Sequence, residues 1–65
     1  MLSLDKQVNL TCIETDKVAK GKIVRIQGNR VDVALDQGGL LISLYMKKAG
    51  LYVGSQSGLE FVMES

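Results

Sequence analysis

The fold is indicated most clearly by residues 21–36, which read GKIVRIQGNRVDVALD. Apolar and polar residues alternate on both sides of the dipeptide Gly28-Asn29, and a period of two is typical of β-strands. A glycine followed by an asparagine suits the two-residue type II′ turn of a β-hairpin. The stretch therefore predicts a hairpin in which residues 18–27 pair with residues 30–36.

The position of the turn sets the register of this hairpin. With the turn at residues 28–29, the opposed pairs are Gln27 with Arg30, Ile26 with Val31, Arg25 with Asp32, and Val24 with Val33. One face then directs apolar side chains to the core, namely Val24, Ile26, Val31, Val33 and Leu35. On the other face Arg25 and Asp32 carry opposite charges, a cross-strand pairing worth roughly a few tenths of a kcal/mol.

The rest of the chain repeats this alternation in short segments. Strands are predicted over residues 8–12, 40–46, 51–54 and 59–63, with turns at 14–17, 38–39 and 55–58 between them. Residues 43–49 also fit a short helix capped by Ser43, with Lys47 and Lys48 in its last turn, although a strand is favoured. We therefore predict a single all-β domain over residues 1–65. Its expected architecture is a small five- or six-stranded antiparallel barrel or sandwich with Gly-rich turns.

The predicted strands carry apolar residues on both faces. Those directed away from the predicted core are Ile13, Ile23, Leu41, Tyr45, Tyr52 and Val62. Two explanations stay open: bulges redistribute residues between the faces, or a second apolar surface pairs with another protein or another copy of the chain. The second explanation predicts a homodimer.

The composition excludes most catalytic chemistry. The chain contains no His and one Cys, which rules out Ser-His-Asp and Cys-His sites, an internal disulfide framework and a zinc site within one chain. Cys12 shares a face with Val8 and Leu10 and is expected in the core. We predict that the protein is not an enzyme and holds no cofactor or metal. Because the sequence shows no signal-peptide pattern and no apolar run near the roughly 20 residues of a membrane span, we expect a cytoplasmic protein without membrane contact.

Positive charge is concentrated in one segment, although the net charge of the whole chain is only +1. No acidic residue interrupts the five basic residues Lys17, Lys20, Lys22, Arg25 and Arg30. Such a strip either contacts the phosphates of RNA or forms a solvated face that discourages edge-to-edge aggregation. Tyr45 and Tyr52 are candidates for base stacking and, with Leu41, for a partner interface.

The stretch from Gly21 to Val33, followed by the later segments Leu51-Tyr-Val-Gly54 and Leu59-Glu-Phe61, resembles the core of a PilZ domain. In that family a strand, a D/N-x-S-x-x-G turn and a returning strand precede a leucine-x-x-glycine element and a closing strand. Here the acidic, serine and last glycine positions of the motif are occupied by Arg25, Gln27 and Arg30, and no R-x-x-x-R precedes residue 20. The resemblance therefore implies a barrel used as a protein-binding adaptor rather than a receptor for cyclic di-GMP.

The N-terminal half is similar to the carbon-storage regulator family. The similar positions are Met1-Leu2, Leu4, Lys6, Val8, Asp16-Lys17-Val18 and residues 26–31, IQGNRV. Proteins of that family are interlocked β dimers that bind GGA-containing RNA loops, so the resemblance implies RNA binding by the basic strip. Asp5 and Gln7 stand where the family has threonine and arginine, and only Lys47 or Lys48 could replace the arginine of its C-terminal segment.

These observations lead to two hypotheses. The favoured one is a non-enzymatic regulatory or adaptor module that acts through protein contacts. The alternative is an RNA-binding barrel that uses the basic strip of residues 17–30, with Tyr45 or Tyr52 as stacking partners.

Overall fold

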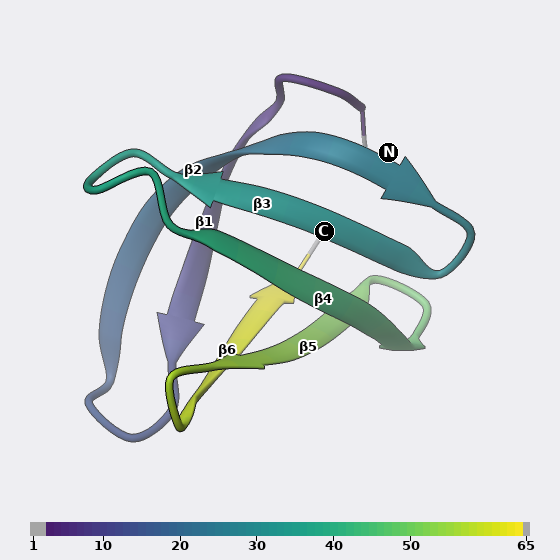
Figure 1. Ribbon diagram of the computed structural model, residues 1–65. Helices are drawn as coiled ribbons and strands as arrows, with labels where there is room; N and C mark the ends of the chain where they lie inside the picture. The colour runs from purple at the N-terminus through teal and green to yellow at the C-terminus, as the bar shows by residue number, and fades with distance from the viewer. Residues whose placement is uncertain (1–2, 65) are drawn as a thin grey trace.

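The strands follow one another around a barrel, each antiparallel to its neighbours (Figure 1). The computed structural model describes residues 3–64, so Met1, Leu2 and Ser65 lie outside the description. The strands are β1 (Gln7–Cys12), β2 (Lys17–Gln27), β3 (Arg30–Leu35), β4 (Leu41–Lys48), β5 (Leu51–Gln56) and β6 (Leu59–Glu64). The barrel closes where β6 pairs with β1. The prediction of a small antiparallel barrel is confirmed, and the number of strands is six.

The hairpin of β2 and β3 has the predicted turn. Gln27 pairs with Arg30, and the ladder continues through Ile26 with Val31 and Arg25 with Asp32. Gly28 has a φ of +59°, a backbone conformation that glycine adopts without strain. The sequence therefore predicted the turn and the first part of the register correctly.

Beyond Arg25 the predicted register is wrong, because β2 contains a bulge. Val33 pairs with Ile23 rather than with Val24, so Val24 is the additional residue of the bulge. The extra residue changes the phase of the alternation. As a result Ile23, predicted to face outward, is fully buried, and Val24, predicted for the core, is 46% exposed.

Residues 43–49 belong mainly to a strand, and the alternative of a short helix is wrong. Ile42 and Leu44 on β4 are fully buried, whereas Ser43 and Tyr45 between and after them point outward. Two other predicted positions need correction. Ile26, assigned to the core, is 40% exposed near the hairpin turn, and Tyr52, assigned to the outside, packs against the core.

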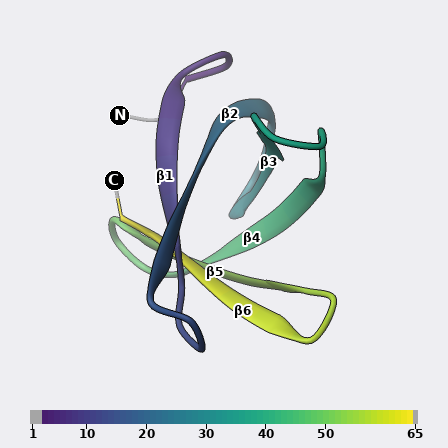
Figure 2. The same ribbon diagram turned by 90° about the vertical axis from the view of Figure 1, so that its left-hand side faces the viewer.

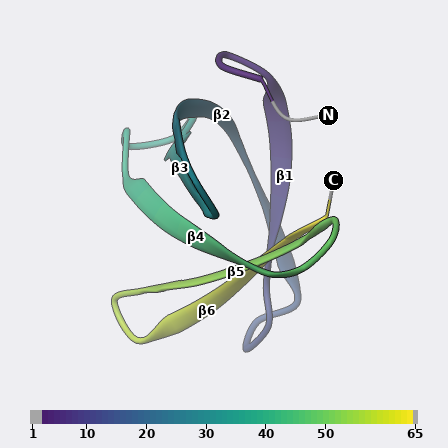
Figure 3. The same cartoon turned by 90° about the vertical axis from the view of Figure 1, so that its right-hand side faces the viewer.

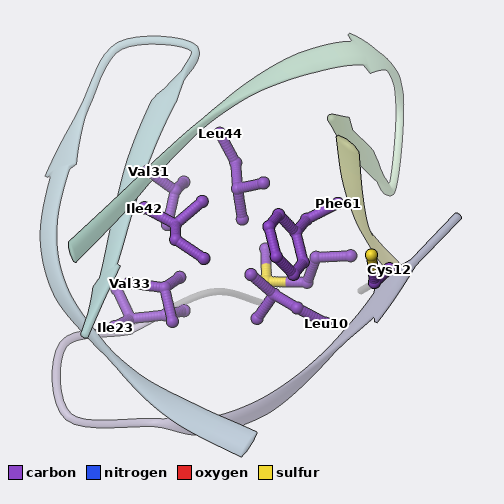
Figure 4. Packing of buried hydrophobic residues seen from close by; sticks show 9 residues of the cluster. Leu10, Cys12, Ile23, Val31, Val33, Ile42, Leu44 and Phe61 are labelled. Carbon is purple, nitrogen blue, oxygen red and sulfur yellow. The ribbon is translucent and has the colours of Figure 1, made fainter. Parts of the chain in front are cut away.

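The core fills the inside of the barrel, as Figure 4 shows. Its buried members are Leu10, Cys12, Ile23, Val31, Val33, Ile42, Leu44, Phe61 and Met63. They come from every strand except β5, whose Gly54 lies against β4. A Cβ atom on Gly54 would overlap the backbone carbonyl oxygen of Ser43 and come within 2.9 Å of the Leu44 side chain. The absence of a side chain at Gly54 therefore lets the backbone of β5 approach β4 closely.

The pairing of β1 with β6 is short compared with the other ladders. Thr11 pairs with Val62 and Cys12 with Phe61. The contact is extended by the backbone N–H of Ile13, which donates to the carbonyl of Glu60 at 2.9 Å. We call this pairing the seam of the barrel.

The turns gather at two opposite ends of the barrel. Figure 2 looks onto the end formed by turns 13–16, 36–39 and 57–58, which connect β1 with β2, β3 with β4, and β5 with β6. Figure 3 looks onto the other end, where turns 28–29 and 49–50 lie together with the segment that precedes β1. Side chains at one end are therefore separated from those at the other by the length of the strands.

Candidate functional site

The outer surface of β2, β3 and β4 carries most of the residues predicted to make contacts. Successive side chains of a strand point to opposite sides of a sheet. Because Val31 and Val33 point into the core, Arg30 and Asp32 point outward, and the burial of Leu44 likewise directs Ser43 and Tyr45 outward. These outward positions define the β2–β4 face, which comprises Lys22, Arg25, Arg30, Asp32, Leu41, Ser43 and Tyr45.

Strand pairing arranges the β2–β4 face in three rows, since residues opposed on neighbouring strands lie side by side. The rows run across the strands as Gln27–Arg30–Tyr45, Arg25–Asp32–Ser43 and Lys22–Ala34–Leu41. Tyr45 thus lies beside Arg30, and one row separates both residues from Leu41. The face combines guanidinium, ammonium, hydroxyl and aromatic groups.

Arg30 is held in place by hydrogen bonds to neighbours on this face. Its Nε donates to Oδ1 of Asp32 at 3.1 Å, and its Nη2 donates to Oδ2 of Asp32 at 3.4 Å and to Oγ of Ser43 at 3.5 Å. The ion pair of Asp32 is therefore formed with Arg30 on the same strand, whereas Arg25, the predicted partner, is only its neighbour in the ladder.

Asp32 is 3% exposed, although its side chain points away from the core. This burial by itself raises the pKa of the carboxyl group. The hydrogen bonds from Arg30 and Ser43, together with attraction to Arg30 and Arg25, outweigh it and hold the pKa of Asp32 below its ordinary value. The same interactions with Asp32 raise the pKa of Arg30. Asp32 is thus ionised at neutral pH and balances one positive charge of the face.

The charges of the chain are distributed unevenly between strands β2, β3 and β4 and the remaining residues. Strands β2, β3 and β4 have Asp32 as their single acidic residue against seven basic residues: Lys17, Lys20, Lys22, Arg25, Arg30, Lys47 and Lys48. The remainder has Lys6 as its single basic residue against six acidic residues: Asp5, Glu14, Asp16, Asp36, Glu60 and Glu64. The net charge of +1 is therefore the sum of +6 on these three strands and −5 on the remaining residues.

The predicted contact residues are not all on one surface. Lys22, Arg25 and Arg30 share the β2–β4 face with Leu41 and Tyr45. Lys20, opposite Asn9, lies further along β2 and borders the end seen in Figure 2. Two residues are elsewhere. Lys17 lies opposite Cys12 at that same end, and Tyr52 packs against the core, which removes it as a stacking partner.

Sequence reasoning missed the residues that orient Arg30. Asp32 was predicted to pair with Arg25, because only partners on the neighbouring strand were considered. Arg30 and Asp32 are two residues apart on the same strand, which also places their side chains on one face. Ser43 was considered only as the N-cap of the alternative helix, because its contact with Arg30 depends on the register between β3 and β4. Lys47 and Lys48 end β4 as exposed residues that add to the positive charge of these strands.

The fold and this face define a class: a six-stranded, up-and-down antiparallel barrel with a basic outer sheet. No family model, curated protein or solved structure matches the chain. Within residues 3–64, no group of three or more His, Cys, Asp or Glu side chains is arranged to hold a metal ion. In the same part of the chain, no helix has the length and apolar character needed to cross a membrane. Small barrels serve many functions, so the PilZ and carbon-storage resemblances stay predictions.

Proposed function

We propose that this protein is a non-enzymatic binding module whose β2–β4 face binds single-stranded RNA. The observation that carries the proposal is the separation of charge, with +6 on β2, β3 and β4 and −5 on the remainder. A surface with an excess of positive charge attracts the phosphate backbone and releases its counterions. The excess on β2, β3 and β4 therefore favours binding of RNA to the outer face of these strands.

Tyr45 supports a single strand as the ligand. Its side chain is 55% exposed and lies beside Arg30, whose side chain is 42% exposed. Aromatic rings and guanidinium planes stack on unpaired bases, which a duplex does not present. The neighbouring cations Arg25 and Lys22 are available for the backbone phosphates, because neither forms an ion pair within residues 3–64.

The hydrogen bonds to Arg30 add geometric definition to this face. Asp32 and Ser43 fix Nε and Nη2, which orients the plane of the guanidinium before any ligand arrives. A side chain that is already ordered loses less conformational entropy on binding. Asp32 also cancels the charge of Arg30, so Arg30 is assigned a stacking role and Arg25 and Lys22 the phosphate contacts.

The test is a fluorescence anisotropy titration with a labelled RNA hairpin that has a GGA loop, compared with a fully paired duplex. We expect the hairpin to bind more tightly, with an affinity that falls steeply between about 50 and 200 mM salt. Arg25→Glu should weaken binding at least about tenfold, since one phosphate contact is replaced by repulsion. The matched control is Lys17→Glu, which changes the net charge by the same amount on the same strand but outside the face. Equal losses in both variants, or no binding at low salt, would overturn the proposal.

A second candidate is the protein-binding adaptor that the PilZ resemblance implies. It is favoured by exposed large apolar side chains on the same strands, namely Val24, Ile26, Leu41, Tyr45 and Met46. Such a contact is insensitive to salt, because it depends on apolar area rather than on counterion release. Leu41→Ser should then abolish binding of an identified protein partner at about 1 M salt while Arg25→Glu leaves it intact. The predicted homodimer is tested by sedimentation equilibrium at micromolar concentration, where a monomer would refute it.

A further inference from the structure

The end of the barrel seen in Figure 2 contains a groove that the β2–β4 face does not use. Its volume is about 690 Å³, within the range of about 300–1,000 Å³ typical of small-molecule sites. The apolar lining comes from β1, β2, β3 and β6 and comprises Cys12, Val18, Ala19, Leu35, Leu59 and Phe61. The mouth of a β-barrel is a common location for ligand sites, because the strands fix its walls.

The polar residues of the groove give it a preferred charge. Lys17 and Lys20 lie along its β2 side, and neither forms an ion pair within residues 3–64. Asp36 lies on the β3 side, where Oδ2 accepts a hydrogen bond of 2.9 Å from Nε2 of Gln7. Among the residues that line the groove, the two cations exceed the one carboxylate, so the lining combines an apolar floor with a net positive charge.

We propose that this groove binds an amphipathic monoanion, that is, a small molecule with a hydrocarbon body and one carboxylate. The hydrocarbon lies against Ala19, Leu35 and Phe61. The carboxylate lies toward Lys17, which occupies a register position opposite Cys12 on the wall of the groove. Lys20 is less suitable, because the backbone N–H of Asp36 donates to the carbonyl of Lys20 at 2.9 Å, which places an acidic residue beside it. This site is independent of RNA binding, since its lining contains no residue of the β2–β4 face.

The size of the side chain at position 19 provides a specific probe of the floor. Ala19 is half-buried and lies opposite the fully buried Leu10 on β1, so its side chain points inward. Leu at this position would fill the groove from the β2 wall. Lys17→Met removes the cation while it keeps a long, unbranched side chain.

The test is an amide NMR titration of the whole chain with sodium octanoate, kept below the concentration at which it forms micelles. We expect saturable shifts concentrated at residues 12, 17–20, 35–37 and 59–61, and binding at least about fivefold weaker for octanol and for octylammonium than for octanoate. Acetate, which lacks the hydrocarbon body, should give no saturable shifts. Lys17→Met should lower the affinity for octanoate to that for octanol. The matched control Lys48→Met, at the other end of the barrel, should leave the affinity for octanoate unchanged.

Three results would overturn this proposal. The first is equal affinity for octanol and octanoate, and the second is amide shifts spread over the outside of the barrel. The third is tighter binding of a peptide that ends in Leu-Phe carboxylate than of octanoate, which would identify a peptide site instead. Ala19→Leu should abolish the shifts in a protein whose amide spectrum is otherwise preserved. If that variant does not fold, Lys17→Met and the comparison of ligands still decide. Arg25→Glu should not alter octanoate binding, so failure of the RNA proposal and failure of this one are distinguishable.

Discussion

Glu14, in the turn after β1, accepts a hydrogen bond of 3.0 Å at Oε1 from the backbone N–H of Glu60 at the start of β6. The same carboxylate oxygen lies 3.8 Å from Sγ of Cys12, whose thiol donates to it. Together with the bond from Ile13 to the carbonyl of Glu60, this contact completes the seam. The backbone hydrogen bond from Glu60 is the main reason that the pKa of Glu14 is lowered. A turn side chain thus supplies a bond at the shortest ladder of the barrel.

Replacing Glu14 should loosen the seam without unfolding the barrel. In Glu14→Ala the N–H of Glu60 loses its acceptor, so its hydrogen exchange should become several-fold faster than in the natural chain. Residues on β3, such as Val33, should keep their protection. The control is Glu64→Ala, which removes an exposed carboxylate at the other end of β6. Equal acceleration in the two variants would show that Glu14 does not stabilise the seam.

Acid should destabilise the protein through Asp32 and Glu14, whose folded-state pKa values both lie below the ordinary ones. At intermediate pH the unfolded chain binds more protons than the folded one, so stability falls as pH falls. The contribution of Asp32 is complete above the ordinary pKa that its carboxyl group has in the unfolded chain, and it is lost as pH falls through the lower pKa of the folded state. Urea unfolding between pH 7 and pH 2, at about unit intervals, checks this direction. A stability that rises toward low pH would contradict it.

Asp32→Asn should lower the free energy of unfolding at pH 7 by about 1–2 kcal/mol. The value is below that of a fully buried ion pair, because Arg30 is partly exposed and remains solvated when its partner is neutral. The difference between Asp32→Asn and the natural chain should shrink at acid pH, where Asp32 is itself protonated. Asp36→Asn, which alters an exposed carboxylate, is the matched control. A difference that stays constant with pH would assign the loss to packing rather than to charge.

Gly54→Ala should destabilise the barrel by about 2–3 kcal/mol, because its methyl group overlaps the carbonyl oxygen of Ser43 and approaches Leu44. Gly58→Ala is the comparison. Gly58 has a φ of +78° but open space around the Cβ position, so only backbone strain of about 1 kcal/mol is expected there. Thermal unfolding of both variants measures the difference. A smaller loss at position 54 than at position 58 would mean that β5 and β4 separate easily.

Replacing Tyr45 should affect RNA binding, whereas replacing Tyr52 should affect stability. Tyr45→Ala should weaken the binding of single-stranded RNA about fivefold to a hundredfold, which corresponds to the loss of one stacked base. The salt dependence of binding should stay unchanged. Its effect on stability should stay within about 0.5 kcal/mol, because the ring is exposed. Tyr52→Ala should instead lower stability by about 2 kcal/mol through lost core packing. RNA titrations followed by anisotropy and urea unfolding, each carried out on both variants, test this difference. Weaker RNA binding in Tyr52→Ala alone would contradict it.

The sequence predicted those parts of the barrel that depend on local pattern. The Gly28-Asn29 turn fixed the pairing from Gln27 to Arg25, and the alternation around Ile42 and Leu44 placed β4 correctly. The bulge at Val24 could not be predicted, because Ile23, Val24 and Ile26 are all β-branched and fit either face. Which of the three lies inside is decided by the closure of the barrel, not by neighbouring residues.

The candidate site was predicted only in part, for the same reason. The spacing along β2 and the pairing across one hairpin place three basic residues on one face, namely Lys22, Arg25 and Arg30. Their proximity to Tyr45 depends instead on the register of β4 against β3. Lys17 was grouped with them by sequence proximity. It lies at the other end because β2 is eleven residues long and passes from pairing with β1 to pairing with β3.

The order of strands has a consequence for how the chain folds. Five of the six ladders join strands that are consecutive in the sequence, and the seam alone joins residues separated by most of the chain. Contacts close in sequence form with little loss of loop entropy, whereas joining the two ends of the meander costs more and yields few bonds. We therefore expect the hairpins to assemble first and the seam to form after the transition state. Substitutions at Thr11 or Val62 would then speed unfolding and leave the rate of folding almost unchanged.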